Sequence, residues 1–341
     1  MFAYMLPIFY TVLQIIVLIT VGFSLRRFAG WGEGFFKNLS TFVIKVVLPV
    51  YLFVRIAPSS PEDLKTSWIF PVAAVVIGFL CVGTGSAVFL LSSLERRQKR
   101  VGIALAGFGN SGYMPLSIIE FFPLSLPAVG ELFGVQEPYM YVAAYLLVQS
   151  PLIWTMGNYL ISGKGVRPKL REIITPPFVS ICVSFLFVVF VPGRVLTDMS
   201  LPSGHLFSAL ERLGDITLPL ILISLGAMIG SIKTGSIRLR EALKMAVGTS
   251  TVRFLLLPGL YFGAYFLFLR RLSLSPAQNW VLFLESVTPP SLTLSIMVNH
   301  AGIRQENTAF SMLVTYILYL LIFPFFMMLF LSLPEIRAGL G

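Results

Sequence analysis

Charged residues are scarce in this sequence, and their scarcity is the first guide to its class. Only 12% of the 341 residues are charged and 56% are hydrophobic, with a mean hydropathy of +0.87. A soluble protein carries about a quarter charged residues. The composition therefore excludes a soluble domain and predicts an integral membrane protein.

Cysteine and histidine are also rare, with two residues of each. Cys81 and Cys182 lie in apolar segments without C-x-x-C spacing, so the sequence gives no support for a metal site, a redox role or a disulfide. It also lacks H-E-x-x-H, G-x-S-x-G and Walker-type phosphate-loop motifs. We therefore expect no enzyme: no catalytic residues, no metal and no cofactor.

Acidic residues number 15 against 25 basic ones, which gives a net charge of +10. In a soluble domain this excess would point to nucleic acid. Here the basic residues gather in short loops, where lysine and arginine orient membrane helices. Nucleic acid is therefore not an expected partner, whereas the lipid bilayer is.

Ten segments are apolar over about 20 residues, the length needed to span a membrane. They are 7–25, 37–57, 68–93, 101–122, 138–161, 173–192, 207–231, 241–269, 277–299 and 307–332. With ten spans, 16 of the 25 lysines and arginines fall on one set of loops and seven on the other. The richer side is expected to be cytoplasmic, which places both termini on the non-cytoplasmic side.

Two of these segments carry matching interruptions. Asn110 to Pro115 aligns with Glu285 to Pro290, so that Asn110 falls on Glu285. Two consecutive prolines, such as Pro289 and Pro290, cannot sit inside an unbroken α-helix, and in lipid the freed backbone groups must find partners in protein or in a watered cavity. Two matching broken helices are a pointer to the binding site of a transporter.

The chain also looks duplicated. Leu48-Pro49 in the second segment matches Leu218-Pro219 in the seventh, at a shift of 170 residues. Because five helices per repeat is an odd number, the second copy must enter the membrane upside down. We expect an all-α fold of two inverted five-helix repeats, residues 1–161 and 173–341, joined by a cytoplasmic linker at 162–172.

Several short stretches carry a family resemblance: Leu48 to Phe53, Gly109 to Ser117, Leu218 to Ala227, Arg253 to Pro258, and Pro289-Pro290. With these, the chain resembles the auxin efflux carrier family, which includes bacterial members described as malonate or malate permeases. The resemblance implies ten transmembrane helices in inverted repeats, with broken helices 4 and 9 that cross. It also implies a fold related to that of bile acid–sodium symporters.

One departure from the family concerns the loop between the fifth and sixth segments. Plant members have a long cytoplasmic loop there, whereas this chain has only about Ser162 to Ile173. The departure favours a compact prokaryotic carrier in the inner (plasma) membrane and puts auxin itself in doubt as the substrate.

The candidate substrate-binding residues surround the two interruptions. We expect half-helix N-termini just after Pro115 and Pro290, each with unpaired N–H groups and about half a positive charge, which suits an anion. The candidates are Asn110, Ser111, Tyr113, Pro115, Ser286, Thr288, Pro289, Pro290 and Ser291. Their side chains either hydrogen-bond a carboxylate or merely satisfy backbone groups freed by the breaks.

Ionisable residues inside a span are costly and are functional hypotheses by default. At about 1.5 Å per residue, Arg253 and Glu285 reach similar depths in a core of about 30 Å, so they are expected to pair. The pair is either a permanent ion pair or a coupling pair that breaks to take up a proton or to hold the anion. Lys45 and Asp215, each four residues before its proline, are secondary candidates that line a cavity or end a helix.

The expected function is a secondary active transporter that moves a small organic anion, such as a carboxylate, by alternating access. Two alternatives stay open: a sodium-coupled organic anion symporter of the bile acid type, and a membrane ligand sensor that does not transport. Coupling to a proton, to sodium or to no ion is open as well, and so is a homodimer.

Overall fold

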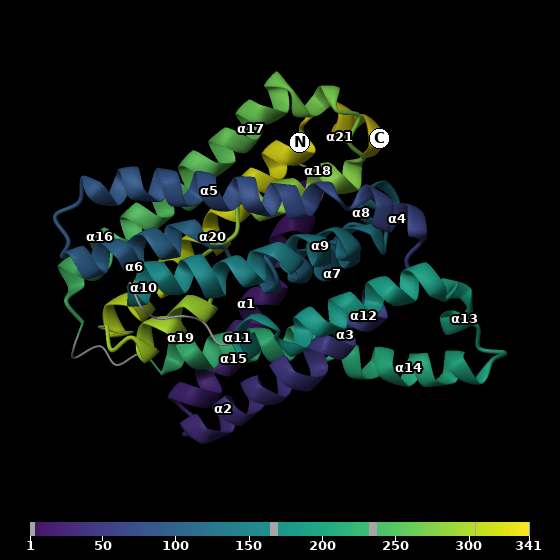
Figure 1. The fold of residues 1–341 in the computed structure, drawn as a ribbon, viewed down its shortest axis with the longest axis horizontal. Coiled ribbons are helices and arrows are strands. Elements are labelled where there is room, and N and C mark those ends of the chain that lie inside the picture. Colours follow the sequence, from purple (N-terminus) through teal and green to yellow (C-terminus); the bar gives the residue numbers. More distant parts are fainter. Residues whose placement is uncertain (1–3, 164–169, 232–236, 304, 341) are drawn as a thin grey trace.

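The computed structural model describes residues 4–163, 170–231, 237–303 and 305–340 (Figure 1). This part of the chain is helical and holds no β-strand, which confirms the all-α prediction. Six of its helices are long and apolar enough to cross a membrane. They are Met5–Arg27, Glu33–Ile56, Pro61–Leu90, Pro202–Gly230, Leu239–Arg271 and Gln305–Leu331.

One set of helices is called here the first bundle. It forms the lower layer of Figure 1, and its member α1 lies behind the other helices in this view. Helix α1 packs on α15, and α3 packs on α12 and α14. The members are α1 (Met5–Arg27), α2 (Glu33–Phe42), the π-helical turn η2 (Val43–Val47), α3 (Leu48–Ile56), α12 (Pro176–Phe190), α14 (Pro202–Asp215) and α15 (Thr217–Gly230).

The remaining long helices form the second bundle, in which α5 packs on α6 and α9, and α16 packs on α20. They are α5 (Ile69–Leu90), α6 (Arg96–Gly107), α7 (Tyr113–Ser125), α9 (Glu137–Leu152), η3 (Ile153–Gly157), α10 (Asn158–Ser162), α16 (Leu239–Thr251), η5 (Val252–Leu256), α17 (Leu257–Leu267), α18 (Pro276–Ser286), α19 (Thr293–His300) and α20 (Gln305–Leu331). Short helices complete the chain: α4 (Pro61–Thr66), α8 (Pro127–Phe133), α11 (Leu170–Ile173), α13 (Gly193–Thr197), η6 (Leu269–Arg271) and α21 (Pro334–Leu340).

Both expected interruptions are present, between α6 and α7 and between α18 and α19. The two connecting segments pair with each other as an antiparallel bridge between Gly109 and Pro290. The N–H of Asn110 donates to the carbonyl of Pro289 at 2.7 Å, and the N–H of Ser291 donates to that of Phe108 at 2.9 Å. Backbone groups freed by one break thus find partners in the other, as burial away from water requires.

The helix boundaries differ from the expected ones in two places. Helix α7 begins at Tyr113, ahead of Pro115 rather than after it. Pro115 fits there because the first four N–H groups of a helix have no helical partner to lose. The expected span 207–231 is two helices that meet at Ile216. Of the expected linker 162–172, residues 164–169 lie outside the described residues.

Candidate functional site

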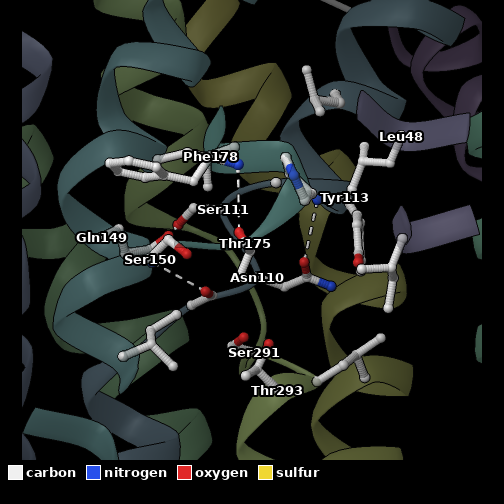
Figure 2. Close-up of a pocket in the computed structure, with 18 of the residues that line it drawn as sticks. Leu48, Asn110, Ser111, Tyr113, Gln149, Ser150, Thr175, Phe178, Ser291 and Thr293 are labelled. Carbon is white, nitrogen blue, oxygen red and sulfur yellow. Dashed lines mark hydrogen bonds between the residues drawn. The ribbon is translucent and has the colours of Figure 1, made fainter. Parts of the chain in front are cut away.

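A cavity of about 200 Å³ lies between the two bundles, beside the paired breaks (Figure 2). The first bundle gives it a mostly apolar wall that includes Leu48, Leu52 and Phe178, with Thr175 at the start of α12. The second bundle gives it a polar wall, here the side chains of Asn110, Ser111, Tyr113, Gln149, Ser150, Ser291 and Thr293, together with apolar residues such as Leu116 and Leu146. An amphipathic molecule would find complementary surfaces on the two sides.

A second cavity of about 380 Å³ adjoins the first, since Ile44, Tyr113 and Thr293 line both. It extends between the bundles to Arg26, Glu33 and Lys37, close to the turn that joins α1 to α2. The two cavities form one route from a charged loop region to the paired breaks.

Asn110 organises the polar wall from the N-terminus of α7. Its side-chain oxygen accepts a hydrogen bond from the Tyr113 N–H at 3.2 Å, as a helix cap does. Its amide nitrogen donates to the Tyr316 hydroxyl at 2.6 Å, and Tyr316 in turn donates to the carbonyl of Pro290 at 3.0 Å. Asn110 therefore connects α7, α20 and the second break while lining the cavity.

Gln149 of α9 is a residue of this wall that the sequence analysis did not identify. Its side-chain nitrogen donates to the Ser111 hydroxyl at 2.7 Å and to the Gly109 carbonyl at 3.1 Å, and the side chain is buried. A signal was present in the sequence: Gln149-Ser150-Pro151 places two polar residues and a proline inside an otherwise apolar segment.

The predicted binding residues divide into two groups. Asn110, Ser111, Tyr113 and Ser291 line the cavity. The others do not: Pro115 packs in α7, and Pro289 and Pro290 present carbonyls to neighbouring groups.

Two of the predicted hydroxyls bond backbone near their own helix end. Ser286 donates to the Phe283 carbonyl at 2.7 Å, and Thr288 donates to the Glu285 carbonyl at 3.3 Å. For Ser286 and Thr288 the geometry matches the alternative in which the hydroxyl satisfies freed backbone.

Arg253 and Glu285 are both buried, and neither lines the cavity. The Arg253 guanidinium reaches the second break, where Nη1 lies 3.5 Å from the Thr288 hydroxyl. In the described part of the chain, both Glu285 oxygens and the Nε and Nη2 atoms of Arg253 lack hydrogen-bond partners. The expected direct Arg253–Glu285 ion pair is not among the ion pairs of the described residues. Ser111 and Arg253 nevertheless lie near enough to interact with the Glu285 carboxylate.

The secondary candidates lie away from the cavity. Lys45 is exposed in η2, and Asp215 is the last residue of α14, so it ends a helix as one alternative expected. Asp215 accepts from Arg55 at 3.1 Å, and Arg55 also pairs with Glu120 at 2.6 Å. Arg55 and Glu120 thus contact one another across the two bundles.

The fold and this site define a class: a helical membrane protein with a polar cavity at paired helix breaks. Residues 7–170 and 166–327 match the model of the membrane transport protein family, and the chain belongs to this family of auxin efflux carriers. The predicted resemblance is confirmed, and with it the assignment to an integral membrane transporter family.

Two curated relatives align along most of their length. An uncharacterized transporter of Methanothermobacter thermautotrophicus is 25% identical, over 84% of this chain and 86% of its own. The protein PIN-LIKES 3 of Arabidopsis thaliana is 24% identical, over 89% of this chain and 92% of its own. Each similarity therefore extends over most of the chain, and the family matches at 7–170 and 166–327 include both interruptions.

Proposed function

We propose that this protein is a secondary active transporter that moves a small organic anion, a carboxylate, by alternating access at the paired helix breaks. The observation that carries the proposal is the cavity between the bundles, whose polar side chains come from the two breaks and from Gln149 and Ser150 of α9. Membership of a membrane transport family supports transport rather than catalysis.

The anion preference rests on the charges that surround the cavity. Helix α7 begins at the cavity with Tyr113, and a helix N-terminus carries about half a positive charge. No carboxylate side chain is among the described residues that line this cavity. The adjoining cavity is lined by two basic residues, Arg26 and Lys37, and by one acidic residue, Glu33. Basic side chains therefore outnumber acidic ones along the adjoining cavity, and the site itself places no carboxylate against an anion.

The finer architecture belongs to the same proposal. The ten spans form two inverted repeats, residues 1–161 and 173–341, around the linker 162–172, and helices 4 and 9 cross at the Gly109–Pro290 bridge. The two family matches meet at residues 166–170, which supports this division. With the basic loops cytoplasmic, both termini lie outside the inner membrane of a prokaryotic cell.

Glu285 and Arg253 are the proposed coupling residues. A proton on Glu285 removes the uncompensated buried charge that burial makes costly. A sodium ion on the same unpartnered oxygens is the second candidate, and it would make the protein a sodium-coupled symporter.

The experiment is a thermal-shift screen of the purified protein against mono- and dicarboxylates, including malonate and malate, with and without sodium and at two pH values. A ligand that binds the folded state raises the melting temperature. Hits then enter counterflow assays in proteoliposomes, with Asn110→Ala as the matched negative control.

The outcomes separate the candidates. A sodium-independent hit with counterflow supports the anion carrier, and a sodium-dependent hit supports the symporter. Binding without counterflow supports a ligand sensor. A set of organic amines is included in the same screen, and hits confined to these cations overturn the proposal.

A further inference from the structure

Arg55 sits in a cluster that joins the two bundles. Its guanidinium pairs with Glu120 of α7 at 2.6 Å and with Asp215 of α14 at 3.1 Å. Glu120 also accepts hydrogen bonds from the hydroxyls of Tyr139 at 2.6 Å and Tyr51 at 3.1 Å. The rings of both tyrosines lie against the guanidinium, 5.5 and 5.6 Å from its central carbon.

The two carboxylates that pair with Arg55 belong to different bundles. Arg55 and Asp215 both belong to the first bundle, whereas Glu120 belongs to the second. Four ion pairs have both partners among the described residues, and Arg55–Glu120 is the one among them that joins the bundles. Separating the bundles here breaks one pair and leaves the other intact.

The cluster lies just beyond the end of the cavity that is farthest from Arg26 and Lys37. On the first bundle, Ile44, Leu48 and Leu52 line the cavity, and Arg55 follows three residues later. On the second bundle, Leu116 lines it and Glu120 follows four residues later. Three or four residues are about one helical turn, or roughly 5 Å. The pair therefore closes the route at the end opposite the Arg26–Lys37 mouth.

We propose that Arg55 is a two-partner latch that seals the cavity on the non-cytoplasmic side. Opening that side moves Glu120 and Tyr139 away with the second bundle, and Arg55 stays behind, paired with Asp215. The inference rests on the alternating access proposed above, and it adds the residues that hold one gate shut.

Asp215 gives the latch its reversibility. Removing one partner of a part-buried ion pair leaves the other charge unpaired, which is costly. Asp215 compensates Arg55 when Glu120 departs, so the open state is not penalised by a free guanidinium. The latch therefore predicts different effects for the two carboxylates. Losing Glu120 favours the open state, whereas losing Asp215 does not.

The test measures access to the cavity without any substrate. In a Cys182→Ser background, Leu116→Cys places a thiol on the cavity wall, and a membrane-impermeant maleimide is applied to intact cells or to inside-out vesicles. Glu120→Gln is expected to raise labelling in intact cells about two- to fivefold, the change that corresponds to losing one partly exposed ion pair.

Asp215→Asn serves as the discriminating variant, because it is expected to give no rise. Glu62→Gln is the matched control: it breaks the exposed Lys65–Glu62 pair, which lies within α4 just beyond α3. Arg55→Gln is the second latch variant if Glu120→Gln does not elute as a folded species, and it is expected to raise labelling too.

The outcomes are decisive in either direction. A rise confined to Glu120→Gln and Arg55→Gln supports the latch. Unchanged labelling in both overturns it, and so does an equal rise in Asp215→Asn or Glu62→Gln, which would make the cluster general structural support. Because no substrate is added, a failed latch is distinguishable from a failed substrate assignment.

Discussion

Gly109 is a position where the Thr288 and Arg253 side chains leave no room for a Cβ atom. A Cβ atom built there would lie 2.1 Å from the Thr288 hydroxyl and 2.7 Å from Nη1 of Arg253. Contacts under 3.0 Å force neighbouring atoms to move. We predict that Gly109→Ala displaces the Thr288 and Arg253 side chains, disturbs the bridge between the two connecting segments and damages the site.

The magnitude follows from two contributions. Overpacking a well-packed interior by one methyl group costs about 1–3 kcal/mol. Each bridge hydrogen bond that lengthens, from Asn110 to Pro289 or from Ser291 to Phe108, costs about 1 kcal/mol more. A loss of about 2–4 kcal/mol in the free energy of unfolding is therefore expected.

The assay is thermal unfolding of the detergent-purified protein, compared with a matched glycine in the same connecting segment. A Cβ at Gly112 would meet nothing closer than the Leu146 side chain at 3.7 Å, an ordinary contact, and Gly112 has a negative φ of −87°. Gly112→Ala should therefore cost less than about 1 kcal/mol, even at a helix N-cap.

A double substitution checks the cause. The Thr288 hydroxyl is the atom nearest to a Cβ at Gly109. Adding Thr288→Ala to Gly109→Ala removes that atom and should restore part of the lost stability, because substitutions at neighbouring residues couple. Equal melting temperatures for Gly109→Ala and the wild type would refute the close pairing. So would a Gly112→Ala variant as damaged as Gly109→Ala.

Three further predictions concern single residues. Asn110→Ala removes the cap of α7 and should abolish carboxylate counterflow while costing about 2 kcal/mol, so that folded protein is still recovered by gel filtration. Glu285→Gln should flatten the pH dependence of counterflow, and a wild-type pH profile would move coupling to another residue. Gly226→Ala should lower the melting temperature, because its Cβ would lie 1.9 Å from the Ile19 carbonyl where α15 meets α1. Gly83→Ala in α5 is the control, since nothing lies within 4 Å of its Cβ.

The sequence predicted the helix breaks because their cause is local. The consecutive prolines at 289 and 290 cannot continue a helix, and α18 ends before them. The interruption before Pro115 also fell near its expected place, although Pro115 itself lies in the first turn of α7. The starting residue of α7 was harder, because a first-turn proline and an interrupting proline look alike without the neighbouring turn. Asn110 was found because it lies in the first interruption and aligns with Glu285 in the second.

The long-range contacts could not be read in the same way. Gln149 reaches Ser111 from another helix, and Tyr316 reaches Asn110 across 206 residues, so neither spacing nor periodicity indicates the partner. From the sequence alone, Arg55 and Glu120 lie near the ends of the expected segments 37–57 and 101–122. Their pairing depends on how the two bundles meet, which the sequence does not indicate. Depth arithmetic placed Arg253 near Glu285 along the membrane normal but carried no information about their orientation.

The aligned positions Asn110 and Glu285 show why a repeated backbone need not repeat its chemistry. If the two residues had one role, both would line the cavity. Asn110 does, whereas Glu285 is buried in the last turn of α18 and does not contact it. Glu285 instead lies close to Ser111, which lines the cavity. Of the two aligned residues, Asn110 therefore contacts the cavity directly, whereas Glu285 reaches it through Ser111.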